Sequence, residues 1–452
     1  MTHALPQASA HVSAHARPNA IAVGGFHDGV SYDARVSPES GGRTVVKLPG
    51  VAAQVGKLTD FFAFTGDANS KYRGASGLLI PSLTNTPRVE YDANGAVLGL
   101  LLEASRINLA LQSEAIDNAV WIKALATITA NAGLGPDGAT VADKIVEDGT
   151  TGVHTATQGV TVVAGTTYTF SAWLRAAGRQ WAQLTFDDGT PNGVSAVFDL
   201  SGGTISKAAF NMGTGTGAVA TIQPWSAALY RCSISGQIAT TAGRILAAPS
   251  NAASPGTNYP NYAGDSASGI HVVGVQFELG PFASSYIPTT AATVTRATDV
   301  VTRVLGSEFN SAAGTLFADV ADFSSADVSI NNCIANLDDT TANKRYTLQR
   351  TNTAGTIRLN VFDGGVNQAS IDGSTHISTL RLKAAYAYAL NDFAIAADGG
   401  AVATDTLGTV PAVTTLRLGQ REGAGELLFG HLRRLDYYPS RLSNAQLQTF
   451  VL

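Results

Sequence analysis

The chain has 452 residues and a formal net charge of −5, with 29 Lys and Arg against 34 Asp and Glu. No block rich in Lys or Arg appears, which argues against nucleic-acid binding, and no run of 18 apolar residues appears, which argues against membrane insertion. Charged residues make up only 14% of the chain, and 47 residues are glycine. Short segments rich in Val, Thr and Gly, bounded by turn residues, are typical of an all-β protein of two or three domains.

Residues 1–55 are polar and weakly patterned, and we expect them to form an extended N-terminal arm. The first 20 residues contain no apolar core and so resemble no ordinary signal peptide. We therefore expect the protein to stay inside the cell that makes it, or to leave by lysis. His11 and His15 have a helical metal-ligand spacing. A proline and two glycines follow them, and no acidic third ligand is near, so we predict solvated histidines and no cofactor.

Residues 56–104 are expected to form a small β connecting region. The stretch DANG at 92–95 predicts a turn between short strands, because Asn-Gly readily supplies left-handed backbone positions. The same stretch resembles a calcium loop only superficially, since its glycine is misplaced and the twelfth loop position lacks a glutamate.

Residues 105–300 contain one alternating segment after another. We expect 167–176 and 180–186 to pair as a hairpin, with their apolar faces toward the core and both tryptophans outward. In 272–280, alternation places Val273, Val275, Phe277 and Leu279 on the core face. Such strands belong to a sandwich in which each sheet has one solvated side.

The predicted outer face holds the most interesting side chains. A sugar ring stacks on indole, and its hydroxyls bind amides, carboxylates and guanidinium groups. Tryptophan and arginine are equally characteristic of subunit interfaces, and a plain sheet surface is the third alternative. The candidates for glycan binding or for an interface are Trp173, Arg175, Trp181, Gln183, Gln276 and Glu278.

The stretch PFASSYIPTT at 281–290 is expected to carry the chain across the sandwich surface, with Pro281 and Pro288 fixing its path. A second all-β pattern follows. Near its end, Ser443 and Gln446 form a capping box before a short helix that would pack on the edge of the sandwich.

Catalytic signatures are missing from the sequence: it has no G-x-S-x-G, P-loop, H-E-x-x-H or dinucleotide motif. Two pairs of adjacent acids are interpreted as turn caps, because neighbouring residues on a strand point to opposite faces and cannot flank one bond. Asp137 and Asp143 are possible oxygen ligands of a structural calcium, but Asp137 also fits a simple turn. The acid pairs are Asp187/Asp188 and Asp338/Asp339, and the two cysteines, Cys232 and Cys333, are expected as buried thiols.

The stretch TPRVEYDANGAVLGLLLEASRINLALQSE at 86–114 resembles a segment common in bacteriophage structural proteins. There, a Pro-Arg-x-x-Tyr-Asp stretch and a Gly-Leu-Leu-x-Glu-x-x-Arg-x-Asn-Leu stretch precede a jelly roll. Residues 121–145 resemble its first strands, and 272–299 its last strand and exit. The final part is similar to concanavalin-A-like lectin or laminin-G-like sandwiches; its matching stretches are GTLFADV, NDFAIAADGG and HLRRLDYYPSRLSNAQLQ.

This resemblance implies an all-β fold of tandem antiparallel β-sandwiches (jelly rolls) preceded by an extended N-terminal arm. The expected domains are an arm for virion attachment, a small β connector, a carbohydrate-binding-module-like jelly roll and a lectin-like sandwich, at 1–55, 56–104, 105–300 and 301–452.

The resemblance also implies a non-enzymatic surface protein of a bacteriophage particle, of the tail-fibre, tail-tip or head-fibre type, which adsorbs to host cell-surface glycan. Expected partners are other virion proteins, bound through the arm, and further copies of the chain, most simply as a homotrimer. Two alternatives stay open: a purely architectural capsid-decorating or tail-joining protein, and a depolymerase of host polysaccharide.

Overall fold

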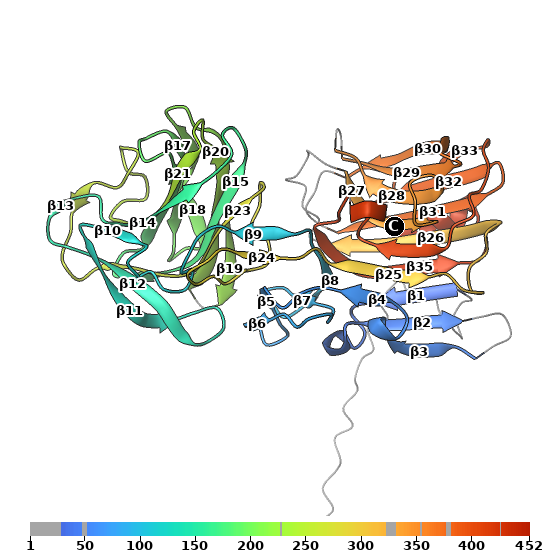
Figure 1. Cartoon of the computed structure of the whole chain (residues 1–452), viewed down its shortest axis with the longest axis horizontal. Coiled ribbons are helices and arrows are strands. Elements are labelled where there is room, and N and C mark those ends of the chain that lie inside the picture. Colours follow the sequence, from blue (N-terminus) through green and yellow to red (C-terminus); the bar gives the residue numbers. More distant parts are fainter. Residues whose placement is uncertain are drawn as a thin grey trace, which may run out of the picture.

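The computed structural model describes residues 29–47, 52–226, 228–321, 331–352, 355–376, 381–424 and 426–452. In these residues the protein is almost entirely antiparallel β-structure with one short α-helix, and the predicted fold class is confirmed. Two sandwiches lie side by side (Figure 1). None of the described helices has the length and apolar character needed to cross a membrane.

The first sandwich consists of two six-stranded sheets that face each other. In spatial order, the β10–β18 sheet contains β10 (Ile122–Ala124), β14 (Thr155–Thr161), β21 (Ala242–Ser250), β16 (Trp181–Asp187), β17 (Gly193–Asp199) and β18 (Thr204–Met212). The β11–β19 sheet contains β11 (Ala126–Leu134), β12 (Thr140–Glu147), β23 (Gly269–Leu279), β15 (Tyr168–Ala177), β20 (Leu229–Gln237) and β19 (Thr216–Ser226).

The predicted alternation of the first sandwich is confirmed in β15 and β16, whose apolar side chains meet in its core. It is wrong for part of β23, because a β-bulge beside Gly274 shifts the register against β15. Val275 and Phe277 point into the core, whereas Val273 lies on the opposite face and Leu279 is exposed. A side chain at position 274 would collide with the ring of Trp173, so the bulge requires glycine.

The second sandwich also has two sheets, and a single apolar core fills the space between them. The β3–β33 sheet contains β3 (Gln54–Lys57), β2 (Arg43–Lys47), β1 (Gly29–Asp33), β35 (Gly430–Tyr438), β26 (Ala313–Ala321), β31 (Leu382–Ala389), β32 (Asp392–Ala397) and β33 (Ala403–Asp405), with β8 (Val97–Leu102) on β35 and β7 (Val89–Tyr91) on β8. The β4–β30 sheet contains β4 (Ala63–Thr65), β25 (Val300–Val304), β34 (Thr415–Leu418), β27 (Asn332–Asp338), β28 (Arg345–Arg350), β29 (Thr356–Asp363) and β30 (Val366–Thr375).

The first four described strands, β1 to β4, belong to this second sandwich, so the prediction of an extended arm is wrong from residue 29 onward. Strand β1 pairs with β35, near the other end of the sequence, and Tyr32 is fully buried in the shared core. The blue strands in Figure 1 therefore continue the orange and red sheet. A short segment can pair with strands that lie hundreds of residues away in the sequence. The local sequence of the segment does not indicate which strand it will pair with. The arm histidines His3, His11 and His15, together with the rest of 1–28, lie outside the described residues.

The α-helix near the C-terminus, α1 (Asn444–Val451), forms as predicted. Ser443 caps it, and its hydroxyl accepts a hydrogen bond from the amide of Gln446, whose side chain bonds back to the amide of Ser443. Leu447 and Val451 pack on an alanine-rich outer face of β31 and β32, rather than on the sandwich edge.

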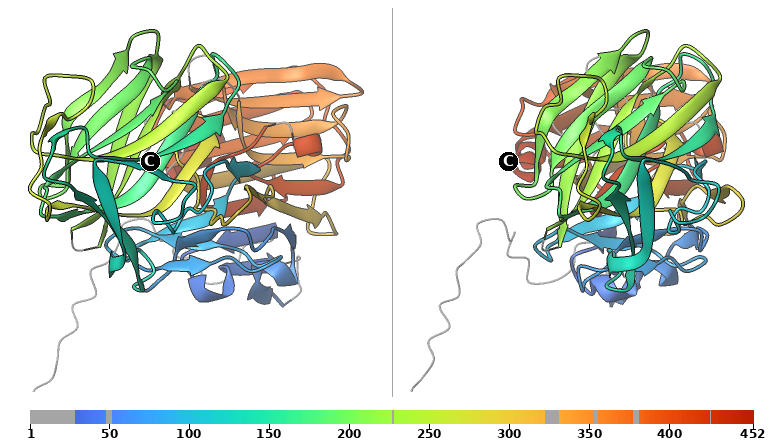
Figure 2. Two further views of the ribbon diagram at one scale, coloured as in Figure 1. Left: turned by 60° about the vertical axis from the view of Figure 1, so that its left-hand side comes forward. Right: turned by 90° about the vertical axis from the view of Figure 1, so that its left-hand side faces the viewer.

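Three two-stranded pairs complete the fold: β5 (Lys71–Arg73) with β6 (Leu79–Pro81), β9 (Arg106–Asn108) with β24 (Val294–Arg296), and β13 (Thr151–Gly152) with β22 (Tyr262–Ala263). The β9–β24 pair crosses between the sandwiches (Figure 1), and the further views in Figure 2 show the blue N-terminal strands as the lower edge of the second sandwich.

Candidate functional site

The two tryptophans of the predicted outer face do not lie together. Strands β15 and β16 form no hairpin: β15 pairs with β20 and β23, whereas β16 pairs with β17 and β21 in the opposite sheet. Trp173 and Trp181 therefore face away from each other on opposite sides of the first sandwich. Both strands still bury their apolar faces in one core, because the chain crosses from sheet to sheet after residue 177.

Trp173 does point to the outer side of its sheet, but other parts of the chain cover it completely. Its ring packs edge-on against Trp225 and Tyr286, at centroid distances of 5.1 and 5.3 Å. The Arg231 guanidinium lies over it at 4.9 Å, and Leu79 of β6 joins the same apolar cluster. The predicted exposed indole is thus wrong, and this residue cannot stack on a sugar in the folded protein.

Gln276 and Glu278 are also buried, and they hold the segment that leaves the first sandwich. Gln276 Oε1 accepts a hydrogen bond from the Ile287 amide at 2.7 Å. Glu278 accepts hydrogen bonds from the amide and hydroxyl of Ser284, at 2.9 and 2.6 Å. The exit segment therefore crosses the outer face of the sheet, as predicted, but in doing so it removes both side chains from solvent.

On the opposite sheet, Gln183 is buried beneath the loop 251–261, where its Nε2 donates to the Asn258 carbonyl at 2.6 Å. Trp181 stays partly exposed at the end of β16. The predicted set is thus divided between two sheets, and only Trp181 and Arg175 reach the surface.

Arg175 differs from every other arginine in the described part of the chain. Each of the others has a hydrogen bond, an ion pair or an aromatic ring as partner, whereas none is found for Arg175. Its side chain is half-buried, and its Nε is buried without a hydrogen-bond partner. Since a guanidinium group has five N–H donors, this residue has unused binding capacity.

Two further basic side chains lie beside Arg175 on the same face. His271 of β23 is directly opposite Arg175, and Lys144 of β12 is directly opposite His271. Directly opposite residues on neighbouring antiparallel strands are about 4.5–5.5 Å apart and share one face. We call Lys144, His271 and Arg175 the basic row. Sequence reasoning missed it, because its members come from three strands and only the strand order brings them together.

The charges of the basic row act on one another. Burial lowers the pKa of His271, and the positive charges of Arg175 and Lys144 lower it further. Lys144 Nζ donates one hydrogen bond, to the Ala267 carbonyl at 2.7 Å, and keeps its other protons. The basic row thus contains two positively charged side chains, Lys144 and Arg175, and their charges oppose protonation of His271 between them.

The acidic candidates have structural roles. Each member of the pairs Asp187/Asp188 and Asp338/Asp339 accepts a hydrogen bond from the amide two residues further along, which confirms the predicted turn caps. Asp137 does the same, and Asp143 accepts the amides of Ile116, Asp117 and Asn131. No cluster with the makings of a metal site occurs among the residues that the structure describes. The two cysteines are buried thiols, as predicted.

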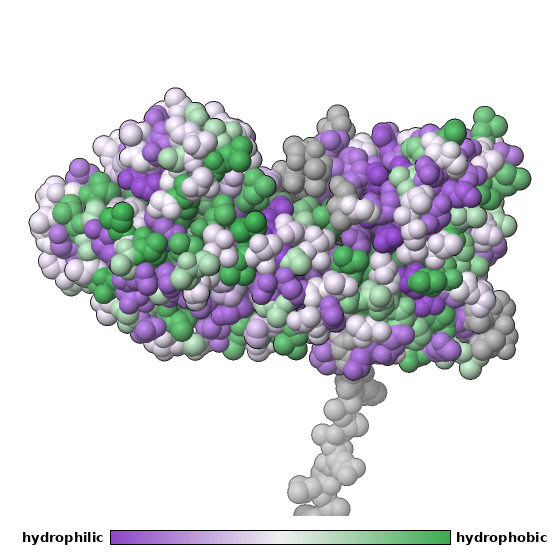
Figure 3. Space-filling model, in the orientation of Figure 1, coloured by the Kyte–Doolittle hydropathy of each residue, from purple (hydrophilic) through white to green (hydrophobic). Residues whose placement is uncertain are grey.

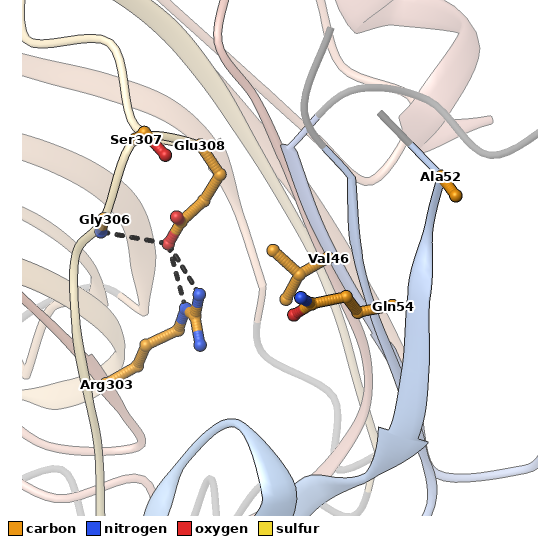
Figure 4. A pocket seen from close by; sticks show the side chains of 7 residues that line it. All are labelled: Val46, Ala52, Gln54, Arg303, Gly306, Ser307 and Glu308. Carbon is orange, nitrogen blue, oxygen red and sulfur yellow. Dashed lines mark hydrogen bonds and ion pairs between the residues drawn. The ribbon is translucent and has the colours of Figure 1, made fainter. Parts of the chain in front are cut away.

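A hollow of about 220 Å³ lies in the second sandwich, between β2, β3 and the loop after β25 (Figure 4). Arg303 and Glu308 line it, and they bind each other at 2.7 and 3.1 Å. Arg303 also donates to the Phe61 carbonyl at 2.9 Å. Because the charges of Arg303 and Glu308 compensate each other, the described lining of this hollow offers no unpaired charge to a ligand.

The visible surface does not point to a large apolar contact. Hydrophilic and hydrophobic residues are interspersed over both sandwiches on the face shown in Figure 3. The best-defined candidate for recognition is therefore the basic row on the first sandwich.

Comparison with known proteins shows partial likeness of fold. No family model matches the chain, and no curated protein matches it. The carbohydrate-binding module CBM40 of the Ruminococcus gnavus IT-sialidase, bound to α2,3 sialyllactose, is 17% identical over 32% of this chain and 84% of its own, with a TM-score of 0.28.

Two other solved structures show likeness of the same kind. Domain 4 of AbnA, a GH43 extracellular arabinanase from Geobacillus stearothermophilus in complex with arabinotriose, is 11% identical over 34% of this chain and 73% of its own, with a TM-score of 0.27. Domains LG4–5 of the mouse laminin α1 chain are 9% identical over 65% of this chain and 88% of their own, with a TM-score of 0.22. Likeness at this level assigns no ligand to the protein.

Proposed function

We propose that this chain is a non-enzymatic recognition protein on the surface of a bacteriophage particle, and that it binds glycan on the host cell. The virion context rests on the resemblance of residues 86–114 and of the two sandwiches to phage structural proteins. Attachment through the N-terminal residues and assembly as a homotrimer belong to the same proposal. Several weak sites in one assembly would raise avidity without any new contact.

One observation carries the binding part of this proposal: Arg175 has no partner among the described residues. Its Nε is buried without a hydrogen-bond partner, whereas the rest of the side chain is half-exposed. The two terminal nitrogens of the guanidinium group can therefore donate to an external acceptor without breaking a bond within the described part of the chain. Hydroxyl and carboxylate oxygens of a sugar are suitable acceptors for a guanidinium.

The acids argue for recognition rather than hydrolysis. Glycoside hydrolysis generally uses two opposed carboxyl groups about 5–9.5 Å apart. The two strongest candidates are instead held by arginines: Asp187 accepts from Arg244 at 2.8 and 2.9 Å, and Asp338 accepts from Arg417 at 2.7 Å. These bonds favour a structural role for both carboxylates over a role in a depolymerase.

A glycan array probed with the whole chain tests the proposal. We expect wild-type protein to bind a subset of bacterial surface glycans and Arg175→Ala to lose that binding. Arg358→Ala is the matched control, because Arg358 lies on the second sandwich in an exposed pair with Asp372. If the wild-type chain binds no glycan, the architectural alternative is the better account. Release of reducing ends from host polysaccharide would instead show a depolymerase.

A further inference from the structure

We infer that the basic row, Lys144, His271 and Arg175, is a binding site for the anionic group of an acidic glycan, and that it binds this group more tightly in mild acid. The inference rests on the proposed function, because it names the class of glycan and a way in which binding is regulated. The anionic group is a carboxylate or a sulfate, since both present several oxygens to a cation.

The geometry suits a single anion. Lys144 and Arg175 flank His271 on three neighbouring strands, so their side chains leave the sheet about 10 Å apart, twice the usual strand spacing. Both are long and flexible, and they can converge on one anionic group at the edge of the imidazole, because Gly133 of β11 covers the face of the ring. Arg175 supplies parallel N–H donors, which match the oxygens of a carboxylate or sulfate.

The basic row has covered residues on both sides. Two residues along each strand from the row lie Val146, Gly269 and Ala177, again directly opposite one another and on the same face. Gly269 is buried, and Lys144 Nζ reaches the carbonyl of Ala267 in the loop just before it. On the other side of the row, Trp173 and Val273 are covered by the rest of the chain. The inference therefore concerns the row itself and the charged group that it would bind.

Among the residues that the structure describes, no negative charge cancels the row. The strand β11 passes over His271, with Gly133 against the ring, and its residues 126–134 include no charged side chain. On β12, Asp143 turns to the other face and accepts three backbone amides. Glu147 is bound by Arg179 and by the hydroxyl of Tyr262. The positive charges that act on His271 are those of Arg175 and Lys144.

Acid dependence follows from reciprocity between the proton and the anion. The two cations and burial oppose protonation of His271, and an anion bound on the row would relieve that opposition. By linkage, if the anion favours protonation of His271, then protonation favours the anion by the same factor. Affinity should thus rise as the pH falls through the range in which His271 takes up its proton.

The test uses the whole chain, with calorimetric titration at pH 7.5 and pH 5.5. Three oligosaccharide probes of similar length serve as ligands: an oligogalacturonate for carboxylates, a heparin oligosaccharide for sulfates, and maltoheptaose as the neutral probe. We expect binding of at least one anionic probe, at least ~3-fold tighter at pH 5.5, and no measurable binding of the neutral one. Arg175→Gln should weaken binding ~10-fold or more, in line with loss of a charge-assisted hydrogen bond.

Two variants make the result specific. His271→Gln should keep the affinity measured at pH 7.5 and lose the gain at pH 5.5. Arg358→Gln removes the same charge from the second sandwich and should change neither. Thermal melting confirms that each variant is folded.

The outcomes separate the inference from the proposed function. Equal binding of neutral and anionic probes would overturn the inference and leave glycan recognition intact. If no oligosaccharide binds, titration with sodium sulfate, followed by the imidazole NMR signals, decides the anion site by itself. A shift of the His271 signal that Arg175→Gln abolishes would uphold the anion site, and the lack of a shift would overturn it.

Discussion

Arg88 and Glu103 form a buried ion pair, with Nη1 of Arg88 2.9 Å from Oε2 of Glu103, at the junction of the two sandwiches. Arg296 binds the same carboxylate oxygen at 2.7 Å, and Asp299 binds Arg88 from the other side at 2.5 Å. Ser285 of the exit segment donates its amide to Glu103. Two of these charges come from the connecting region and two from the linker after the first sandwich, so the network ties both to one point.

Removal of Glu103 should therefore destabilise the protein strongly. Glu103→Ala leaves two buried guanidinium groups with Asp299 as their remaining carboxylate, and breaking a buried ion pair in this way costs about 3–5 kcal/mol. We expect a loss of this size in the free energy of unfolding, measured by urea denaturation. Arg358→Ala, which breaks the exposed pair with Asp372, should cost about 1 kcal/mol or less. Equal losses in the two variants would contradict a stabilising junction.

Glu103 should also give the protein part of its acid sensitivity. Burial opposes the charged form of this carboxyl, but Arg296 and Arg88 outweigh burial and hold its pKa well below the ordinary value. An unfolded glutamate has a pKa of about 4.3, so this stabilisation is complete above that pH and is lost as the pH falls toward the folded value. In Glu103→Gln, we expect a shallower fall of the free energy of unfolding between about pH 4.5 and pH 2.

Asp299 does not contribute to that loss. Burial raises its pKa even though Arg88 lies beside it, so its contribution to stability has the opposite sign. An unchanged pH slope in Glu103→Gln would show that other carboxyl groups, not the junction, control acid unfolding.

The two tryptophans of the predicted outer face should respond differently to mutation. Trp173→Ala removes a fully buried ring from contact with Trp225 and Tyr286, and substitutions of this kind cost about 3–5 kcal/mol. Trp181→Ala removes a partly exposed ring and should cost far less. Denaturant unfolding of both variants checks this, and a larger loss in Trp181→Ala would be inconsistent with the burial of Trp173.

These positions show how far local patterns reach. Alternation correctly predicts that Phe170 and Trp173 lie on opposite faces of β15, because successive side chains of a strand must diverge. It cannot show that Leu79, more than 90 residues earlier, covers Trp173 and makes the second face a core as well. In the same way, the Ser443–Gln446 cap is local and was predicted, whereas the Gly274 bulge depends on how β23 meets β15.

The candidate site was predicted only in part for the same reason. Arg175 could be selected from its own strand, as a basic residue on the polar face. Lys144 and His271 could not be added to it, because the pairing of β12, β23 and β15 follows the strand order of the sheet and not the order of the sequence. Whether Arg175 has a hydrogen-bond or ion-pair partner depends on the tertiary structure around it, and the local sequence does not indicate this.

The N-terminal strands should be required for the second sandwich. Val30, Tyr32 and Val46 are buried in its core, and each buried apolar side chain of this size contributes about 1.5–3 kcal/mol. Deletion of residues 1–57 also leaves the edge of β35 without the β1 hydrogen bonds, and an unpaired strand edge promotes aggregation. We expect this truncation to lower the soluble yield and the melting temperature. Deletion of residues 1–28 is the matched control, because it keeps β1 to β3, and it should melt like the whole chain. If both truncations melt alike, the pairing of β1 with β35 does not stabilise the protein.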